Sequence, residues 1–123
     1  MRTSGTPHMV GGSGSAIALE RVKFVDAKMK EGFLQELLHE SPALLPVASF
    51  DEHFGPLASL GREIMGIDNL FISPAGRLTV VETKLWRNPQ ATRRVLAQIL
   101  DYAARLSKLG FEELEATCRR AAD

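Results

Sequence analysis

The chain has 123 residues, which is enough for one compact domain with a single hydrophobic core. Its formal net charge of zero argues against a generic binder of polyanions, and its single cysteine, Cys118, rules out an internal disulfide and a cysteine-rich zinc site. No apolar run approaches the length that spans a bilayer, and the first residues lack the pattern of a signal peptide. We therefore expect a cytoplasmic protein without a membrane partner.

The N-terminal part predicts a lead and then the first elements of a domain. Residues 1–15 are rich in Gly, Ser, Thr and Pro and have no apolar period, so we interpret them as an expression tag or a flexible lead. Residues 16–123 are expected to form one domain. Partial alternation over residues 17–25 predicts a strand, and helical spacing of apolar residues predicts a helix over residues 27–40. Pro42 should end that helix, because the residue before a proline disfavours the helical conformation.

Two strand-like runs in the middle of the chain predict a β-hairpin. Residues 62–73 and residues 77–86 flank Pro74-Ala75-Gly76, which is a typical turn sequence. If Ser73 faces Arg77 across the turn, the numbers of paired residues on the two strands sum to 150.

A long helix is predicted after the hairpin. Asn88 suits an N-cap and Pro89 the first helical position, so the helix should begin there and run to about Leu109, before Gly110. Its core face would carry Val95, Leu96, Ile99, Tyr102, Ala103 and Leu106. A short acidic helix is expected over residues 111–122.

Charge is distributed unevenly along the chain although its total is zero. Between Lys84 and Lys108 the only acid is Asp101, and the basic residues are Lys84, Arg87, Arg93, Arg94, Arg105 and Lys108. An enzyme that acts on a polyanion needs such a basic segment to hold phosphates beside acids that hold a metal.

One pair of carboxylates stands out. Strand alternation places Glu82 and Lys84 on the same face as the apolar Val80, and the expected register sets Asp68 opposite Glu82 with Cβ atoms about 4.5–5.5 Å apart. Two ionised carboxylates at this separation repel unless a cation or a proton lies between them. Carboxylate oxygens with water and phosphate suit Mg²⁺ or Mn²⁺, and Lys84 could orient a water or stabilise charge on a phosphate.

A plainer interpretation of the same residues stays open. Asp68 or Glu82 could form a cross-strand salt bridge with Lys84 in an ordinary hairpin. Charged groups on an otherwise apolar face are costly unless they are paired or functional, and this favours the metal site.

The motifs together resemble the PD-(D/E)XK nuclease superfamily, and within it the RecB-like branch. The resemblance covers residues 31–109 and is carried by Gly66-Ile67-Asp68, Val80-Val81-Glu82-Thr83-Lys84, the QxxxY pattern Gln98-Ile99-Leu100-Asp101-Tyr102, Glu31-x-x-Leu34 and Pro42-Ala43-Leu44-Leu45-Pro46. It implies an α/β fold with a restriction-endonuclease-like α-β-β-β-α core and a central mixed sheet flanked by helices. Where the pattern has a final strand, residues 111–122 read as helix, so that strand is missing, truncated or supplied by a partner.

The resemblance also implies roles for individual residues. Asp68 and Glu82 become ligands of Mg²⁺ or Mn²⁺, and Lys84 the catalytic lysine. Gln98 and Tyr102 would support the site or meet the substrate, with a core aromatic as the alternative for Tyr102. An additional acid is implied at Glu31, for which a solvated residue in the first helical turn is the alternative. Arg87, Arg93 and Arg94 would contact DNA phosphates, although Arg93 and Arg94 could equally belong to a solvated helix face.

The sequence therefore predicts a metal-dependent nuclease that hydrolyses DNA phosphodiester bonds. Two alternatives share the fold. One is a nucleic-acid-binding module without activity, and the other is an interaction module that forms a homodimer through the sheet edge or the last helix.

Overall fold

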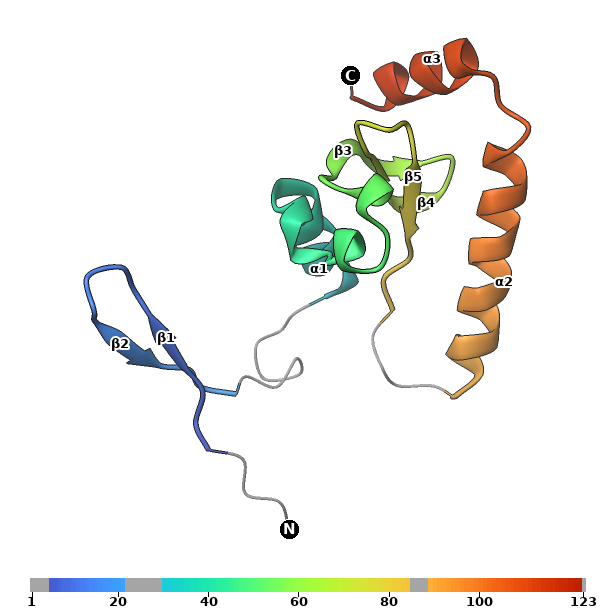
Figure 1. The fold of residues 1–123 in the computed structure, drawn as a ribbon. Helices are drawn as coiled ribbons and strands as arrows, with labels where there is room; N and C mark the ends of the chain where they lie inside the picture. Colours follow the sequence, from blue (N-terminus) through green and yellow to red (C-terminus); the bar gives the residue numbers. More distant parts are fainter. Residues whose placement is uncertain (1–4, 22–29, 85–88, 123) are drawn as a thin grey trace.

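A computed structural model describes residues 5–21, 30–84 and 89–122 of the chain. The fold is mixed α/β, with three α-helices around a three-stranded sheet (Figure 1). In chain order the elements are β1 (His8–Val10), β2 (Ala16–Ala18), α1 (Glu31–Glu40), the 3₁₀ turns η1 (Pro42–Leu44), η2 (Val47–Ser49) and η3 (Glu52–Phe54), β3 (Ala58–Ile64), β4 (Ile67–Ile72), β5 (Leu78–Val81), α2 (Pro89–Leu106) and α3 (Phe111–Ala122).

The sheet has the order β3-β4-β5, and both pairings are antiparallel. The expected mixed sheet is therefore wrong for the described residues, which place no parallel or further strand in it. The strands pair antiparallel because tight turns join them, whereas a parallel pair would need a longer crossover connection. The central strand β4 is buried on both faces, and Ile67, Leu70 and Phe71 are at most 1% exposed.

The connection between β3 and β4 corrects the predicted strand over residues 62–73. A two-residue turn interrupts that run, with Ile64 paired to Ile67 and positive φ angles of 56° at Met65 and 81° at Gly66. Positive φ at both central residues is the geometry of a tight hairpin turn. Met-Gly lacks the usual Asn-Gly or Asp-Gly signal of that turn, so the sequence pattern did not reveal it.

Two glycines offer a matched test of this turn. Neither Gly66 nor Gly32, which lies inside α1, has an atom within 4 Å of an added Cβ. Gly66→Ala is expected to lower the free energy of unfolding by about 1 kcal/mol, because only the left-handed backbone opposes it. Gly32→Ala should raise it by about 0.5–1 kcal/mol, because alanine favours helix. Urea unfolding of both variants checks this, and a stabilising Gly66→Ala would contradict the turn.

The connection between β4 and β5 agrees with the prediction. The Ser73 amide donates to the Arg77 carbonyl at 2.9 Å, and the Gly76 amide donates to the Ser73 carbonyl at 2.9 Å. The paired residues run from Ile72 opposite Leu78 to Asn69 opposite Val81, and the sum of 150 is confirmed along the ladder.

Helices cover both faces of the sheet (Figure 1). On one face, Asn69 of β4 is paired with Arg62 of β3, and both side chains bind α1. The Asn69 side-chain amide donates to the backbone carbonyl of Gln35 at 2.8 Å, and Arg62 donates to the side-chain oxygen of Gln35 at 3.1 Å. On the other face, Leu70 packs with Tyr102 of α2 in the hydrophobic core. Helix α3 contacts β3 and adds Leu114 and Cys118 to that core.

The predicted helices are largely confirmed. Helix α1 ends at Glu40 and α3 spans Phe111–Ala122 as expected, whereas α2 ends at Leu106 rather than Leu109. Tyr102 is buried and Val95, Ile99 and Leu106 are half-buried, but Leu96 and Ala103 are exposed. Their assignment to the core was wrong, because α2 rests on the sheet through a narrower stripe than its apolar residues define.

The N-terminal segment contains a small hairpin. Strands β1 and β2 pair antiparallel, with Met9 opposite Ile17, and all six strand residues are exposed. For the strand predicted over residues 17–25, the described residues confirm only the part in β2, which pairs with β1 and not with the sheet. Residues 22–29, with the predicted start of α1, lie outside the described residues.

Candidate active site

The carboxylates that the sequence singled out lie where β4 and β5 part. Strand β5 ends at Val81, which is paired with Asn69. Asp68 and Glu82 are the residues next to that last pair, just beyond the end of the ladder. The side chain of Glu82 is only 2% exposed and Asp68 is 8% exposed, so both acids are buried.

Asp68 has a hydrogen-bonding partner that the sequence did not indicate. Its Oδ2 accepts the amide of Thr83 at 2.8 Å and the hydroxyl of Thr83 at 2.9 Å. Strict alternation would have turned Thr83 to the opposite face from Asp68. Because the chain has already left the ladder at Glu82, both donors of Thr83 reach the carboxyl group instead.

Glu82 forms an ion pair with the neighbouring lysine. Lys84 Nζ lies 2.7 Å from Glu82 Oε1, while Glu82 Oε2 is buried and makes no hydrogen bond of normal geometry with the described residues. The Tyr102 hydroxyl adds only a weak hydrogen-bonding contact with the Glu82 carboxyl group. A buried oxygen without a partner destabilises a fold by about 1–3 kcal/mol. Such an atom leaves room for a further donor or a cation, which the salt bridge with Lys84 does not supply.

The charge state of Lys84 follows from its neighbours. The hydrogen bond with Glu82 is the main cause that raises the pKa of the Lys84 ammonium; burial opposes it, and the charges of Glu82, Glu31 and Asp68 add to it. Lys84 is therefore a cation at neutral pH. The same interactions show that Glu31, the first residue of α1, lies near enough to act on Lys84.

Tyr102 connects α2 to the same end of the sheet. Its hydroxyl donates to the Gly66 carbonyl at 2.8 Å, and the Arg105 guanidinium, 5.0 Å from the Tyr102 ring centroid, donates to the Met65 carbonyl at 3.0 Å. Burial is the first cause that raises the pKa of Tyr102, and the charges of Glu82 and Asp68 follow; the Arg105 charge opposes them, and a hydrogen bond with Glu82 adds a smaller rise. Tyr102 is thus both a core aromatic and a neighbour of the carboxylates.

A titration of Tyr102 tests this geometry, because the chain has a single tyrosine. Its tyrosinate absorbance is expected to rise with an apparent pKa above the ordinary value of about 10. Glu82→Gln should lower this pKa but leave it raised, since burial remains. Because the fold raises the pKa of Tyr102, the folded state favours the protonated phenol. The free energy of unfolding gained in this way is present below the unfolded-state pKa of about 10 and should be lost as the pH rises above it. An unchanged pKa in Glu82→Gln would contradict the proximity of the two groups.

The structure does not bring all of the remaining predicted residues to the candidate site. Gln98 is half-buried on α2, one turn before Tyr102. Arg93 and Arg94 are exposed on the first half of α2, and Arg87 lies outside the described residues. The structure therefore brings Glu31, Asp68, Glu82, Lys84 and Tyr102 into one neighbourhood and leaves the two arginines on the surface.

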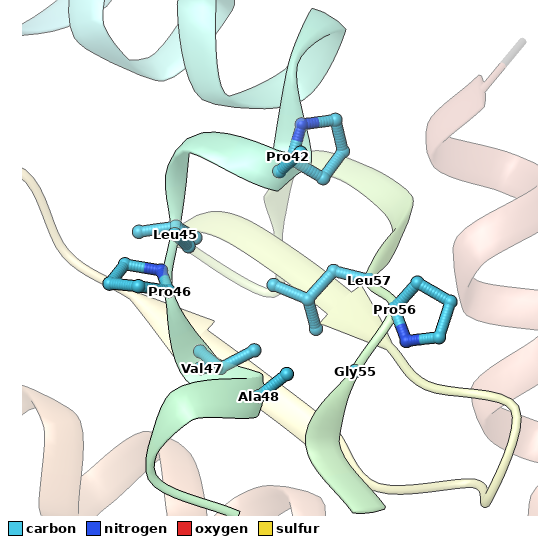
Figure 2. Close-up of a pocket in the computed structure, with 9 residues that line it drawn as sticks. Pro42, Leu45, Pro46, Val47, Ala48, Gly55, Pro56 and Leu57 are labelled. Carbon is cyan, nitrogen blue, oxygen red and sulfur yellow. The ribbon is translucent and has the colours of Figure 1, made fainter. Parts of the chain in front are cut away.

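A separate apolar pocket lies in the connector between α1 and β3 (Figure 2). Its volume is about 270 Å³, and Leu45, Val47, Pro56 and Leu57 are among its lining residues. None of the carboxylates or the lysine of the candidate site lines it. Its apolar lining does not suit a phosphate, so it is distinct from the site.

The donor set decides which metal could fit. Across residues 5–21, 30–84 and 89–122 there is no group of three or more His, Cys, Asp or Glu side chains arranged to hold an ion. Mg²⁺ keeps several waters and commonly uses one or two carboxylates together with substrate phosphates. As two buried carboxylates, Asp68 and Glu82 fit that mode of binding.

Comparison of the chain with protein-family models, with curated proteins and with solved structures gave no match. Among the described residues, no helix combines the length and the apolar character needed to cross a membrane.

Proposed function

We propose that this protein is a metal-dependent nuclease that hydrolyses phosphodiester bonds of DNA with Mg²⁺ or Mn²⁺, on a restriction-endonuclease-like core. One observation carries the proposal: the buried Glu82 has one oxygen paired with Lys84 and a second oxygen that makes no hydrogen bond of normal geometry with the described residues, and the charge of the buried Asp68 acts on the same lysine. A hydrated divalent ion would supply the missing interaction and offset the repulsion between the two carboxylates.

The residues divide the chemistry between them. Asp68 and Glu82 would hold the ion, which when bound polarises a phosphoryl oxygen and lowers the pKa of water. A lysine has an ordinary pKa well above 7, so the ammonium group of Lys84 is a poor acceptor for a proton of the attacking water. Its ammonium group instead stabilises the negative charge that develops on the phosphate oxygens.

DNA is proposed as the substrate because exposed cations lie on the element that flanks the site. Arg93 and Arg94 are exposed on α2, the helix that also carries Tyr102. Cations held on a rigid helix can contact phosphates along a backbone, which gives affinity that falls with salt. A cytoplasmic location belongs to the same proposal.

A cleavage assay tests the proposal. Supercoiled, linear and single-stranded DNA are incubated with the protein and Mn²⁺, with and without a chelator. We expect cleavage by the parent that the chelator stops, and a rate about 100- to 1,000-fold lower in Lys84→Ala. Arg120→Ala removes an exposed cation on α3, outside the basic segment, as a control and should cut at nearly the parent rate. Equal cleavage by the parent and Lys84→Ala would contradict the proposed role of Lys84.

A second candidate is an interaction module on the same fold. It is favoured by Leu96 and Leu100, which are 60% and 62% exposed one turn apart on α2. Sedimentation of the wild type beside Leu96→Lys distinguishes the candidates. A wild-type dimer that the substitution dissociates, together with absence of cleavage, would support the module rather than the nuclease.

A further inference from the structure

Thr83 has a role that its place between Glu82 and Lys84 does not suggest. Its side chain is not directed to solvent, because the residue is only 7% exposed. Its amide and hydroxyl both donate to Asp68 Oδ2, at 2.8 and 2.9 Å. Asp68 is itself 8% exposed, so little water competes for these bonds.

Two donors on one oxygen constrain a carboxyl group strongly. The terminal torsion of an aspartate is broad, so the plane of an unheld carboxyl group can rotate. Because Oδ2 accepts two hydrogen bonds from Thr83, its lone pairs are engaged and the plane is held. Asp68 Oδ1 is then the oxygen through which the carboxylate can bind a cation.

We infer that Thr83 is a positioning residue for Asp68: its hydroxyl holds the carboxyl group in the orientation in which Asp68 and Glu82 bind one divalent ion. This inference rests on the proposed function, since it assigns Thr83 to the same metal site. Groups that orient metal ligands in this way commonly change metal affinity by about 10- to 100-fold when they are removed.

The alternative is that the hydrogen bond only satisfies a buried hydroxyl. The two explanations differ in what they affect. A purely structural bond changes the stability of the metal-free protein, whereas a positioning bond also changes the affinity for metal.

The test is a calorimetric titration of the full chain with Mn²⁺. Thr83→Val has nearly the same shape as threonine but lacks the hydroxyl, and Thr83→Ser keeps the hydroxyl; the backbone amide remains in both. We expect Thr83→Val to bind Mn²⁺ about 10- to 100-fold more weakly than the wild type, and Thr83→Ser to bind like the wild type. DNA cleavage by Thr83→Val should return toward the wild-type rate at saturating Mn²⁺.

Each outcome decides the inference. Equal Mn²⁺ affinity of Thr83→Val and the wild type overturns it, even if the metal-free variant unfolds at lower urea concentration. If Thr83→Val does not fold, Thr83→Ala beside Thr83→Ser gives the same comparison. A wild type that binds no Mn²⁺ overturns the proposed function and the inference together, whereas wild-type binding with equal binding by the variants overturns the inference alone.

Discussion

Lys84→Ala is expected to destabilise the metal-free protein by about 2 kcal/mol, whereas Glu82→Gln should cost less than about 1 kcal/mol. The asymmetry follows from burial, since the side chain of Glu82 is 2% exposed and that of Lys84 is 35% exposed. Without Lys84, a carboxylate remains in the interior and has lost its ion-pair partner. Without the Glu82 charge, the flexible lysine can carry its ammonium group to water. The partial exposure of Lys84 is why we expect less than the full effect of breaking a buried pair.

Urea unfolding without divalent ions measures this difference. Lys84→Met keeps the apolar stem of the side chain and removes only the charge, so it should lose nearly as much stability as Lys84→Ala. Addition of Mn²⁺ should recover part of the loss in both lysine variants, because the ion compensates the Glu82 charge. Equal losses in Glu82→Gln and Lys84→Ala would contradict the account of the buried carboxylate.

Glu82→Gln is expected to lower cleavage by about 1,000-fold or more, a change of about 4 kcal/mol in the activation barrier. The reason is loss of a charged metal ligand, so the variant should also bind Mn²⁺ weakly. Lys84→Ala should instead keep its affinity for Mn²⁺, because removal of the lysine cation leaves both carboxylates free to bind the ion. Calorimetric titration of the two variants separates a ligand from a group that stabilises charge.

Glu52→Gln is the matched control for that experiment. Glu52 is an exposed carboxylate in η3 and lies outside the proposed site. Its variant should bind Mn²⁺ and cut DNA like the wild type. Weakened Mn²⁺ binding in Lys84→Ala, comparable with that in Glu82→Gln, would show that the roles assigned to the two residues are wrong.

The sequence was informative where a local signal determines geometry. Pro74-Ala75-Gly76 predicted a turn that sets Ser73 opposite Arg77, and that register carries through to Asn69 opposite Val81. Asp68 and Glu82 are the residues next to that last pair. The local pattern of residues 111–122 likewise predicted a helix, and the structure confirms it as α3.

Other features depend on contacts between distant segments and could not be read from local patterns. The Met65-Gly66 turn lacks a turn signal and is held by hydrogen bonds from Tyr102 and Arg105. Thr83 reaches Asp68 only because the chain leaves the ladder, so alternation misplaced it. Helical periodicity identified an apolar face on α2, but it could not show that Leu96 would lie outside the contact with the sheet.

The central claim is that Asp68, Glu82 and Lys84 form a metal-dependent nuclease site. The most direct test incubates supercoiled DNA with Mn²⁺ and either the wild type or Glu82→Gln, after both are shown to be folded. The account predicts nicked and linear products with the wild type and intact DNA with Glu82→Gln over the same time. Intact DNA with both proteins, or equal cleavage by both, would contradict it.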